Sequence, residues 1–136
     1  MSIGNAVVGA LLRSPFHRAM SGSIDLIRYT GRRSGRVITT PTQYATHGDD
    51  VVILVGHPES KQWWRNFSEA CDVEVLVAGV WRPMRGRALV GADEPETVRP
   101  LLETYLARFP RAARSLDGTS SDERVRRSVV VECRPR

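Results

Sequence analysis

The 136-residue sequence is poor in cysteine and contains no long apolar run, and each absence excludes a class of protein. Its two cysteines, Cys71 and Cys133, are too few for a disulfide scaffold and favour a reducing compartment, so we expect the protein in the cytoplasm. No stretch approaches the roughly 20 apolar residues of a membrane-spanning helix. The apolar stretch 6–12 is short and follows no Lys or Arg, so we expect no signal peptide.

Patterns that identify a self-contained catalytic site are also missing. The three histidines, His17, His47 and His57, have no ligand-like spacing to one another or to cysteine, so we expect no metal site. The sequence has no Gly-x-Ser-x-Gly nucleophile motif. If the protein is an enzyme, we therefore expect a cofactor to carry the chemistry, with Tyr44 and His57 as candidate proton donors if the fold brings them to the site.

Positive charge is concentrated in the first third of the chain. The net charge is +5, and residues 1–40 contain six arginines and one acidic residue, which account for the whole excess. Half of those arginines, Arg32, Arg33 and Arg36, fall within five positions. Such clustering favours a pocket for one anionic group over an extended nucleic-acid surface, so we expect no specific nucleic-acid partner.

Hydrophobic periodicity predicts one domain over residues 1–136, with a helical segment over residues 1–20. Tight turns and alternating apolar residues predict an α+β fold with a six-stranded antiparallel sheet that closes into a barrel with flanking helices. Pro41 indicates that its strand lies at a sheet edge or a bulge. The six expected strands are Ile24–Thr30, Arg36–Thr46, Val51–Val55, which we expect to be buried on both faces, Val73–Val77, Val80–Val90 and Ser128–Glu132.

Two helices are expected between and after these strands. The first follows Pro58, with Ser60 as its N-cap and an apolar face made by Trp63, Trp64, Phe67 and Ala70. The second follows Asp93, which resembles the start of a capping box with Glu96. Pro100 predicts a break in this helix at Arg99. A polar loop is expected to follow Pro110.

Three short segments are candidates for ligand binding, and each also has an ordinary structural explanation. In the turn Thr30–Arg36, two glycines permit positive φ, so backbone N–H groups could form an anion-binding nest beside three arginines; a solvated basic turn is equally consistent. Thr39-Thr40-Pro41 is either a ligand-facing edge or ordinary strand. In Trp63-Trp64-Arg65-Asn66, one tryptophan is expected in the core and the other near a cleft.

Together these segments resemble the deazaflavin-dependent nitroreductase and quinone reductase family of actinobacteria. The residues that carry the resemblance are Thr30–Arg36, Thr39-Thr40-Pro41, Gly48-Asp49 and Trp63–Phe67, followed by the late helix and a valine-rich last strand. The resemblance covers residues 24–134. It implies a split β-barrel and binding of coenzyme F420, whose acidic tail would lie along the basic turn.

The resemblance also implies which residues bind the cofactor. Residues of the basic turn would hold the phosphate of the tail, and the segment Ile53–His57 would border the deazaflavin ring beside Trp63 and Asn66. The full set of expected cofactor-binding residues is Arg32, Arg33, Ser34, Gly35, Arg36, Thr40, Pro41, Ile53, Leu54, Val55, Gly56, His57, Trp63 and Asn66.

The leading hypothesis is an F420-dependent oxidoreductase that transfers a hydride from reduced deazaflavin to a small-molecule acceptor: a quinone, a nitro compound or an enone. Two alternatives remain open. On the same fold, the protein could be an FMN-binding reductase or a carrier of a flavin or another anionic ligand. In a different class, it could be a basic interaction module, with the N-terminal helix as a peripheral membrane contact. A homodimer is compatible with each reading.

Overall fold

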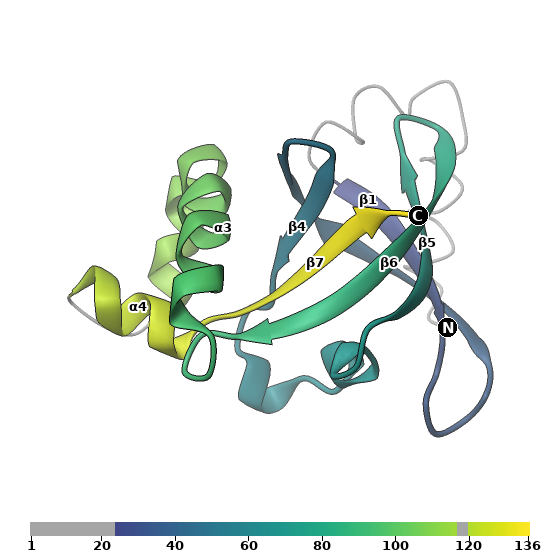
Figure 1. Ribbon diagram of the computed structural model, residues 1–136, viewed down its shortest axis with the longest axis horizontal. Coiled ribbons are helices and arrows are strands. Elements are labelled where there is room, and N and C mark those ends of the chain that lie inside the picture. The colour runs from purple at the N-terminus through teal and green to yellow at the C-terminus, as the bar shows by residue number, and fades with distance from the viewer. Residues whose placement is uncertain (1–23, 117–119) are drawn as a thin grey trace.

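The computed structural model describes residues 24–116 and 120–136, which form a strongly curled antiparallel sheet with helices on its outer side (Figure 1). The expected helical segment over residues 1–20 lies outside the described residues. The strands are β1 (Ile24–Thr30), β2 (Val37–Gln43), β3 (Ala45–His47), β4 (Asp50–Leu54), β5 (Cys71–Val77), β6 (Val80–Val90) and β7 (Val129–Pro135). The helices are α3 (Pro95–Arg108) and α4 (Ser121–Arg127), with short 3-10 turns η1 (Pro58–Ser60), η2 (Trp63–Phe67) and η3 (Pro110–Ser115).

In the described part of the chain the sheet has seven strands in the order β2-β1-β5-β6-β7-β4-β3, so the α+β class is confirmed but the expected count of six is wrong. The sheet curls into a half-barrel whose described edge strands, β2 and β3, do not pair, so the expected closure into a barrel is not reached. The difference in strand count comes from the segment expected as the single strand Arg36–Thr46. That segment divides at the buried Tyr44 into β2, which pairs with β1, and β3, which pairs with β4. The two parts therefore lie at opposite edges of the sheet, and Pro41 lies in an edge strand, as expected.

Two large hydrophobic clusters lie on the two faces of the curled sheet, and a third, small cluster of described residues contains Leu26 and Leu76. The inner cluster fills the curl and is closed from one side by Trp64 and Phe67 of η2. The outer cluster lies under α3, η3 and α4, which cover β3, β4 and β7 (Figure 1). The predicted burial of β4 on both faces is confirmed, because Val51 and Ile53 belong to the inner cluster and Val52 to the outer one.

The late helix, α3, differs from the expectation at its N-terminus and at Pro100. Glu94 and not Asp93 is the N-cap residue, and no side chain caps the helix, so the capping box is absent. The helix also continues through Pro100 without a break. Pro100 is exposed and lies early in the helix, where it removes one backbone hydrogen bond; burial of Val98, Leu101, Leu102 and Tyr105 offsets that loss.

Two further segments correct the expectations. The segment after Pro58 forms the 3-10 turns η1 and η2, so Ser60 ends one turn and does not cap a helix, and Ala70 is exposed. Part of the expected polar loop is α4, which Ser120 caps by accepting a hydrogen bond from the Glu123 amide. Among the described helices, none has the length and hydropathy that would let it cross a membrane.

Gly91 gives the first testable prediction, because a Cβ at this position would lie 1.6 Å from the Val125 carbonyl oxygen. The Gly91 amide also donates to the Ser128 carbonyl at 2.8 Å, which fixes this approach. We expect Gly91→Ala to lower the free energy of unfolding by about 2–3 kcal/mol, since α4 must shift. Chemical denaturation measures this loss.

The matched control is Gly56→Ala, because a Cβ at Gly56 would meet no atom within 4 Å. Its free energy of unfolding should stay close to that of the wild type. Equal stability of the two variants would contradict the close packing of α4 against the end of β6.

Candidate functional site

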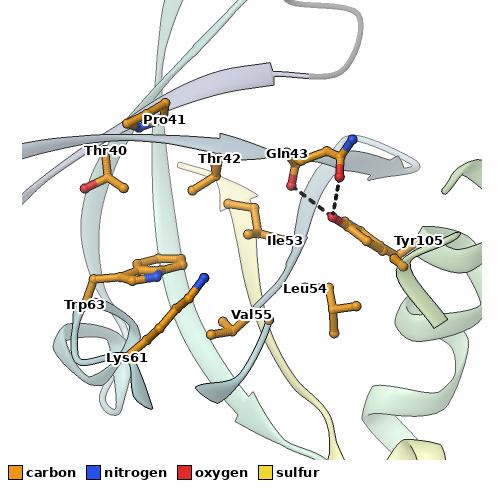
Figure 2. A pocket seen from close by; sticks show the side chains of 12 residues that line it. Thr40, Pro41, Thr42, Gln43, Ile53, Leu54, Val55, Lys61, Trp63 and Tyr105 are labelled. Atoms are coloured by element: carbon orange, nitrogen blue, oxygen red, sulfur yellow. Dashed lines mark hydrogen bonds between the residues drawn. The ribbon is translucent and has the colours of Figure 1, made fainter. Parts of the chain in front are cut away.

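A cavity of about 540 Å³ opens where the edge strand β2 approaches the end of β4 (Figure 2). One wall is polar and comes from β2, with Thr40, Thr42 and Gln43. The opposite wall is apolar and consists of the segment 53–55 at the end of β4. Tyr105 of α3 closes one side, where its hydroxyl lies 3.4 Å from Gln43 Oε1. The cavity can therefore accept a flat apolar group that has hydrogen-bonding edges.

A second cavity of about 410 Å³ adjoins the first, and Thr40 and Trp63 line both. It extends to the basic turn between β1 and β2, from which Arg32, Arg33 and Ser34 line it. The two cavities form one groove, apolar at one end and cationic at the other. A ligand that joins a flat ring to an anionic tail matches this distribution of charge.

The backbone of the basic turn differs from the expected nest. Gly35 has a φ of 68°, but Gly31 does not have positive φ. The Gly31 amide donates to the Arg36 carbonyl and the Gly35 amide donates to the Gly31 carbonyl, so both are already used within the turn. The Arg36 amide likewise donates to Ser34 Oγ. Recognition of an anion at this turn therefore depends on the guanidinium groups more than on backbone N–H groups.

Asn66 connects the basic turn to η2. Its side-chain oxygen accepts a hydrogen bond from the Arg32 amide at 2.7 Å, and its side-chain nitrogen donates to the Trp63 carbonyl at 2.8 Å. One side chain therefore fixes the cationic end of the groove relative to Trp63, which stands at the junction of the two cavities.

One of the two adjacent tryptophans lies in the core and the other lies at the groove, as the sequence predicts. Trp64 is buried in the inner cluster, and its indole nitrogen donates to the Pro58 carbonyl at 2.9 Å. Trp63 is half-buried, packs edge-to-face against Phe67, and faces the groove. Trp64 thus anchors the turn while Trp63 forms part of the site.

Most of the expected cofactor-binding residues gather along this groove. Eleven of the fourteen line one cavity or both. Gly35, Arg36 and His57 line neither. His57 is exposed, with a left-handed φ of 51°, and Tyr44 is buried beneath Arg108. The two candidate proton donors, Tyr44 and His57, therefore lie outside both cavities.

Several groove residues were not predicted from the sequence. Lys61 extends from the loop between η1 and η2 into the first cavity, beside the Trp63 ring (Figure 2). Tyr105 comes from α3, more than 60 positions after β2, so no local spacing in the sequence predicts that it lines the groove. Side chains alternate between the two faces of a strand, so Thr42 lies on the same face of β2 as Thr40. This alternation is a signal from which Thr42 could have been predicted as a groove residue. The remaining lining residues without a prediction are Tyr29, Gly31, Ile38, Gln43, Gln62 and Ala112.

Asp25 of β1 is an acidic group enclosed directly behind the polar wall. Its side chain is fully buried, and Thr42 Oγ1 donates a hydrogen bond to Asp25 Oδ1. Asp25 Oδ2 has no hydrogen-bond partner among the described residues. Burial, only partly offset by the Thr42 hydrogen bond, raises the pKa of Asp25 from 3.8 to about 7. A large fraction of this carboxyl is therefore neutral at pH 7.

The described part of the chain contains no group of three or more His, Cys, Asp or Glu that could hold a metal ion.

The curled sheet and its groove define a split-barrel-like protein with a ligand-binding groove, and comparison with known proteins gives the family. The family model of F420H(2)-dependent quinone reductases matches residues 13–119. The chain belongs to this family.

One curated relative is the Mycobacterium tuberculosis protein Rv3178, whose name is that of an F420H(2)-dependent quinone reductase. The two are 27% identical over 78 residues, which make up 55% of this chain and 65% of the relative. The match thus spans just under two thirds of the relative's length.

Solved structures with similar folds include an F420-H2 dependent reductase, FDR-A, with 17% identity, a TM-score of 0.57, and coverage of 82% of this chain and 93% of that one. The haem storage protein HutZ of Vibrio cholerae is 10% identical, with a TM-score of 0.54 and coverage of 91% and 90%. At these identities the similarity concerns the fold, which carries different chemistries in different proteins.

The bridging role of Asn66 is testable by substitution. Asn66→Ala removes the acceptor of the Arg32 amide and the donor to the Trp63 carbonyl, so we expect the protein to lose about 1–2 kcal/mol of stability. The Arg32 amide should also exchange its hydrogen faster, which hydrogen-exchange NMR detects. Ser68→Ala is the matched control, because Ser68 Oγ donates to the Arg65 carbonyl in the same segment without reaching the turn. Unchanged exchange at Arg32 in Asn66→Ala would contradict the bridge.

Asp25 predicts a particular dependence of stability on pH. The folded protein holds the Asp25 proton more tightly than the unfolded chain does, so this group favours folding most below about pH 4. Its contribution is lost as the pH rises to about 7, a decline of at most about 4 kcal/mol. Asp25→Asn cannot ionise and should lack this decline in denaturation series from pH 4 to 8. The exposed Asp93→Asn should keep it, and parallel curves for wild type and Asp25→Asn would contradict the buried acid.

Proposed function

We propose that this protein is an F420-dependent oxidoreductase that reduces a small electrophilic acceptor, with a quinone as the first candidate and nitro compounds or enones as further ones. The observation that carries the proposal is the joined groove, in which a basic turn adjoins a cavity with an apolar wall and a polar wall. Membership of the F420H(2)-dependent quinone reductase family supports the choice of cofactor and reaction.

The groove fits the cofactor in both charge and shape. Arg32 and Arg33 would hold the acidic tail through forked, charge-assisted hydrogen bonds, with the hydroxyl of Ser34 beside them. The deazaflavin ring would lie in the larger cavity against the segment 53–55 and beside Trp63. When bound and reduced, F420 supplies the hydride.

The protein itself contributes positioning, exclusion of water and hydrogen bonds. The apolar wall at the end of β4 excludes water from one face of a bound ring, and Trp63 restricts its position at the junction of the cavities. Thr40, Thr42 and Gln43 offer hydrogen bonds along the other wall. The Lys61 ammonium, which extends into the cavity, would stabilise negative charge that develops on an acceptor oxygen.

The proposal also covers the partners and the location of the protein. Its partner would be a small-molecule electron acceptor in the cytoplasm, and a homodimer remains a prediction. A similar fold, 15% identical with a TM-score of 0.52 and coverage of 97% of this chain and 99% of that one, is a domain-swapped dimer. Sedimentation analysis tests whether this chain dimerises.

The cofactor assignment is tested by fluorescence titration of the purified protein with F420 and, in parallel, with FMN. We expect saturable binding of F420, and we expect Arg32→Ala/Arg33→Ala to raise the Kd at least about tenfold, because charge-assisted hydrogen bonds to the tail are lost. Reduction of menadione by the protein loaded with reduced F420 then tests the reaction.

The matched control removes two arginines from another surface. Arg85 and Arg87 on β6 pair with Asp72 and Glu94, away from the groove, so Arg85→Ala/Arg87→Ala makes the same change in charge. Its Kd for F420 should stay within about threefold of the wild type, as expected for a screened surface charge. Absence of F420 binding, or equal losses in both double variants, would contradict the proposal; saturable binding of FMN alone would favour the alternative of an FMN-binding protein.

A further inference from the structure

We propose that Asp25 and Thr42 form a proton relay that delivers a proton to the reduced oxygen of the acceptor in the larger cavity. The inference rests on the proposed function and adds the source of the proton. Neither Tyr44 nor His57 can be this source, because neither side chain lines the groove.

The geometry provides a path of two groups. Asp25 and Thr42 are directly opposite each other in the pairing of β1 with β2, and Thr42 Oγ1 is hydrogen-bonded to Asp25 Oδ1. Thr42 also lines the larger cavity, and its side chain lies on the cavity side of β2 (Figure 2). The Thr42 hydroxyl is therefore the contact between an enclosed acid and the space in which an acceptor would bind.

The surroundings of Asp25 suit a carboxyl group that holds and releases a proton better than one that only makes structural hydrogen bonds. It is fully buried, and its second oxygen, Oδ2, has no partner among the described residues. A buried carboxylate that served only structure would be expected to have both oxygens satisfied, because an unpaired buried charge is costly. A protonated carboxyl avoids much of that cost.

Three titratable side chains outside β1 interact electrostatically with Asp25. Tyr44 lies between β2 and β3, Tyr105 lies in α3 and Cys133 lies in β7. Burial raises the pKa of all three, that of Tyr105 to about 12, so they stay neutral near pH 7. Of these four groups, Asp25 is the one that can exchange a proton in the physiological range.

The transfer balances in atoms and charge. The bound, reduced cofactor would supply a hydride. An acceptor that took it up would gain an electron pair and carry a negative charge on one oxygen. The Thr42 O–H bond breaks as this oxygen takes its proton, and Thr42 Oγ1 takes the carboxyl proton of Asp25. Asp25 is left as a carboxylate, which takes a proton from solvent after the product leaves. When Asp25 is protonated, its carboxyl hydrogen is donated to Thr42 Oγ1, and the Thr42 hydroxyl turns its own hydrogen from Asp25 toward the cavity. A hydroxyl can do this because it accepts one hydrogen bond while it donates another.

Two substitutions test the relay by single-turnover reduction of menadione at pH 5.5 to 9. In the wild type we expect the rate to fall about tenfold per pH unit above pH 7, as the acid loses its proton. Thr42→Val and Asp25→Asn should each slow the reaction about 100-fold at pH 6 and abolish this pH dependence. Thr42→Ser should keep both rate and profile. Thr46→Val, at an exposed site on β3, is the control that should match the wild type.

A measurement without cofactor separates the relay from the reaction. Carbon-13 NMR of aspartate-labelled protein should show one carboxyl that titrates near pH 7 and is absent in Asp25→Asn. A wild type that reduces menadione while Thr42→Val keeps the wild-type pH profile would overturn the relay alone, as would an Asp25 carboxyl that titrates near pH 4. A wild type that fails to bind F420 would overturn the proposed function, and the relay with it.

Discussion

The gap between β2 and the end of β4 is the constraint on which the site depends. Seven strands curl far enough to bring these segments together, yet β2 pairs with β1 and β4 pairs with β3 and β7, so the curl holds a cavity there. Pro41 suits this place, since an edge strand can lack an amide hydrogen without losing a sheet bond. Hydroxyl groups from one strand thereby face an apolar wall from another.

A single 3-10 turn, η2, joins the core to the site. Trp64 and Phe67 are buried in the inner cluster, while Trp63 and Asn66 face the groove and the basic turn. The burial of two aromatic side chains thus stabilises the position of the two neighbours that shape the site. Asp25 has the opposite effect, because the burial of its carboxyl lowers the stability of the fold above about pH 4.

The sequence predicted those features of the fold that depend on residues close together along the chain. The burial of β4, the edge position of Pro41 and the separate roles of Trp63 and Trp64 are of this kind. The unbroken α3 was not predictable from Pro100, since packing against the sheet outweighs a local penalty. Asp25 lies behind the polar wall because β1 pairs with β2, and Lys61 reaches the groove through the path of a loop. No spacing along the chain reveals either position.

The most direct test of this account is a crystal structure of the protein with oxidised F420 bound. The account predicts that the anionic tail contacts Arg32 and Arg33 and that the deazaflavin ring lies between β2 and the end of β4, beside Trp63. A cofactor bound on the outer face of the sheet, against α3 or along the arginines of β6 and β7, would contradict it.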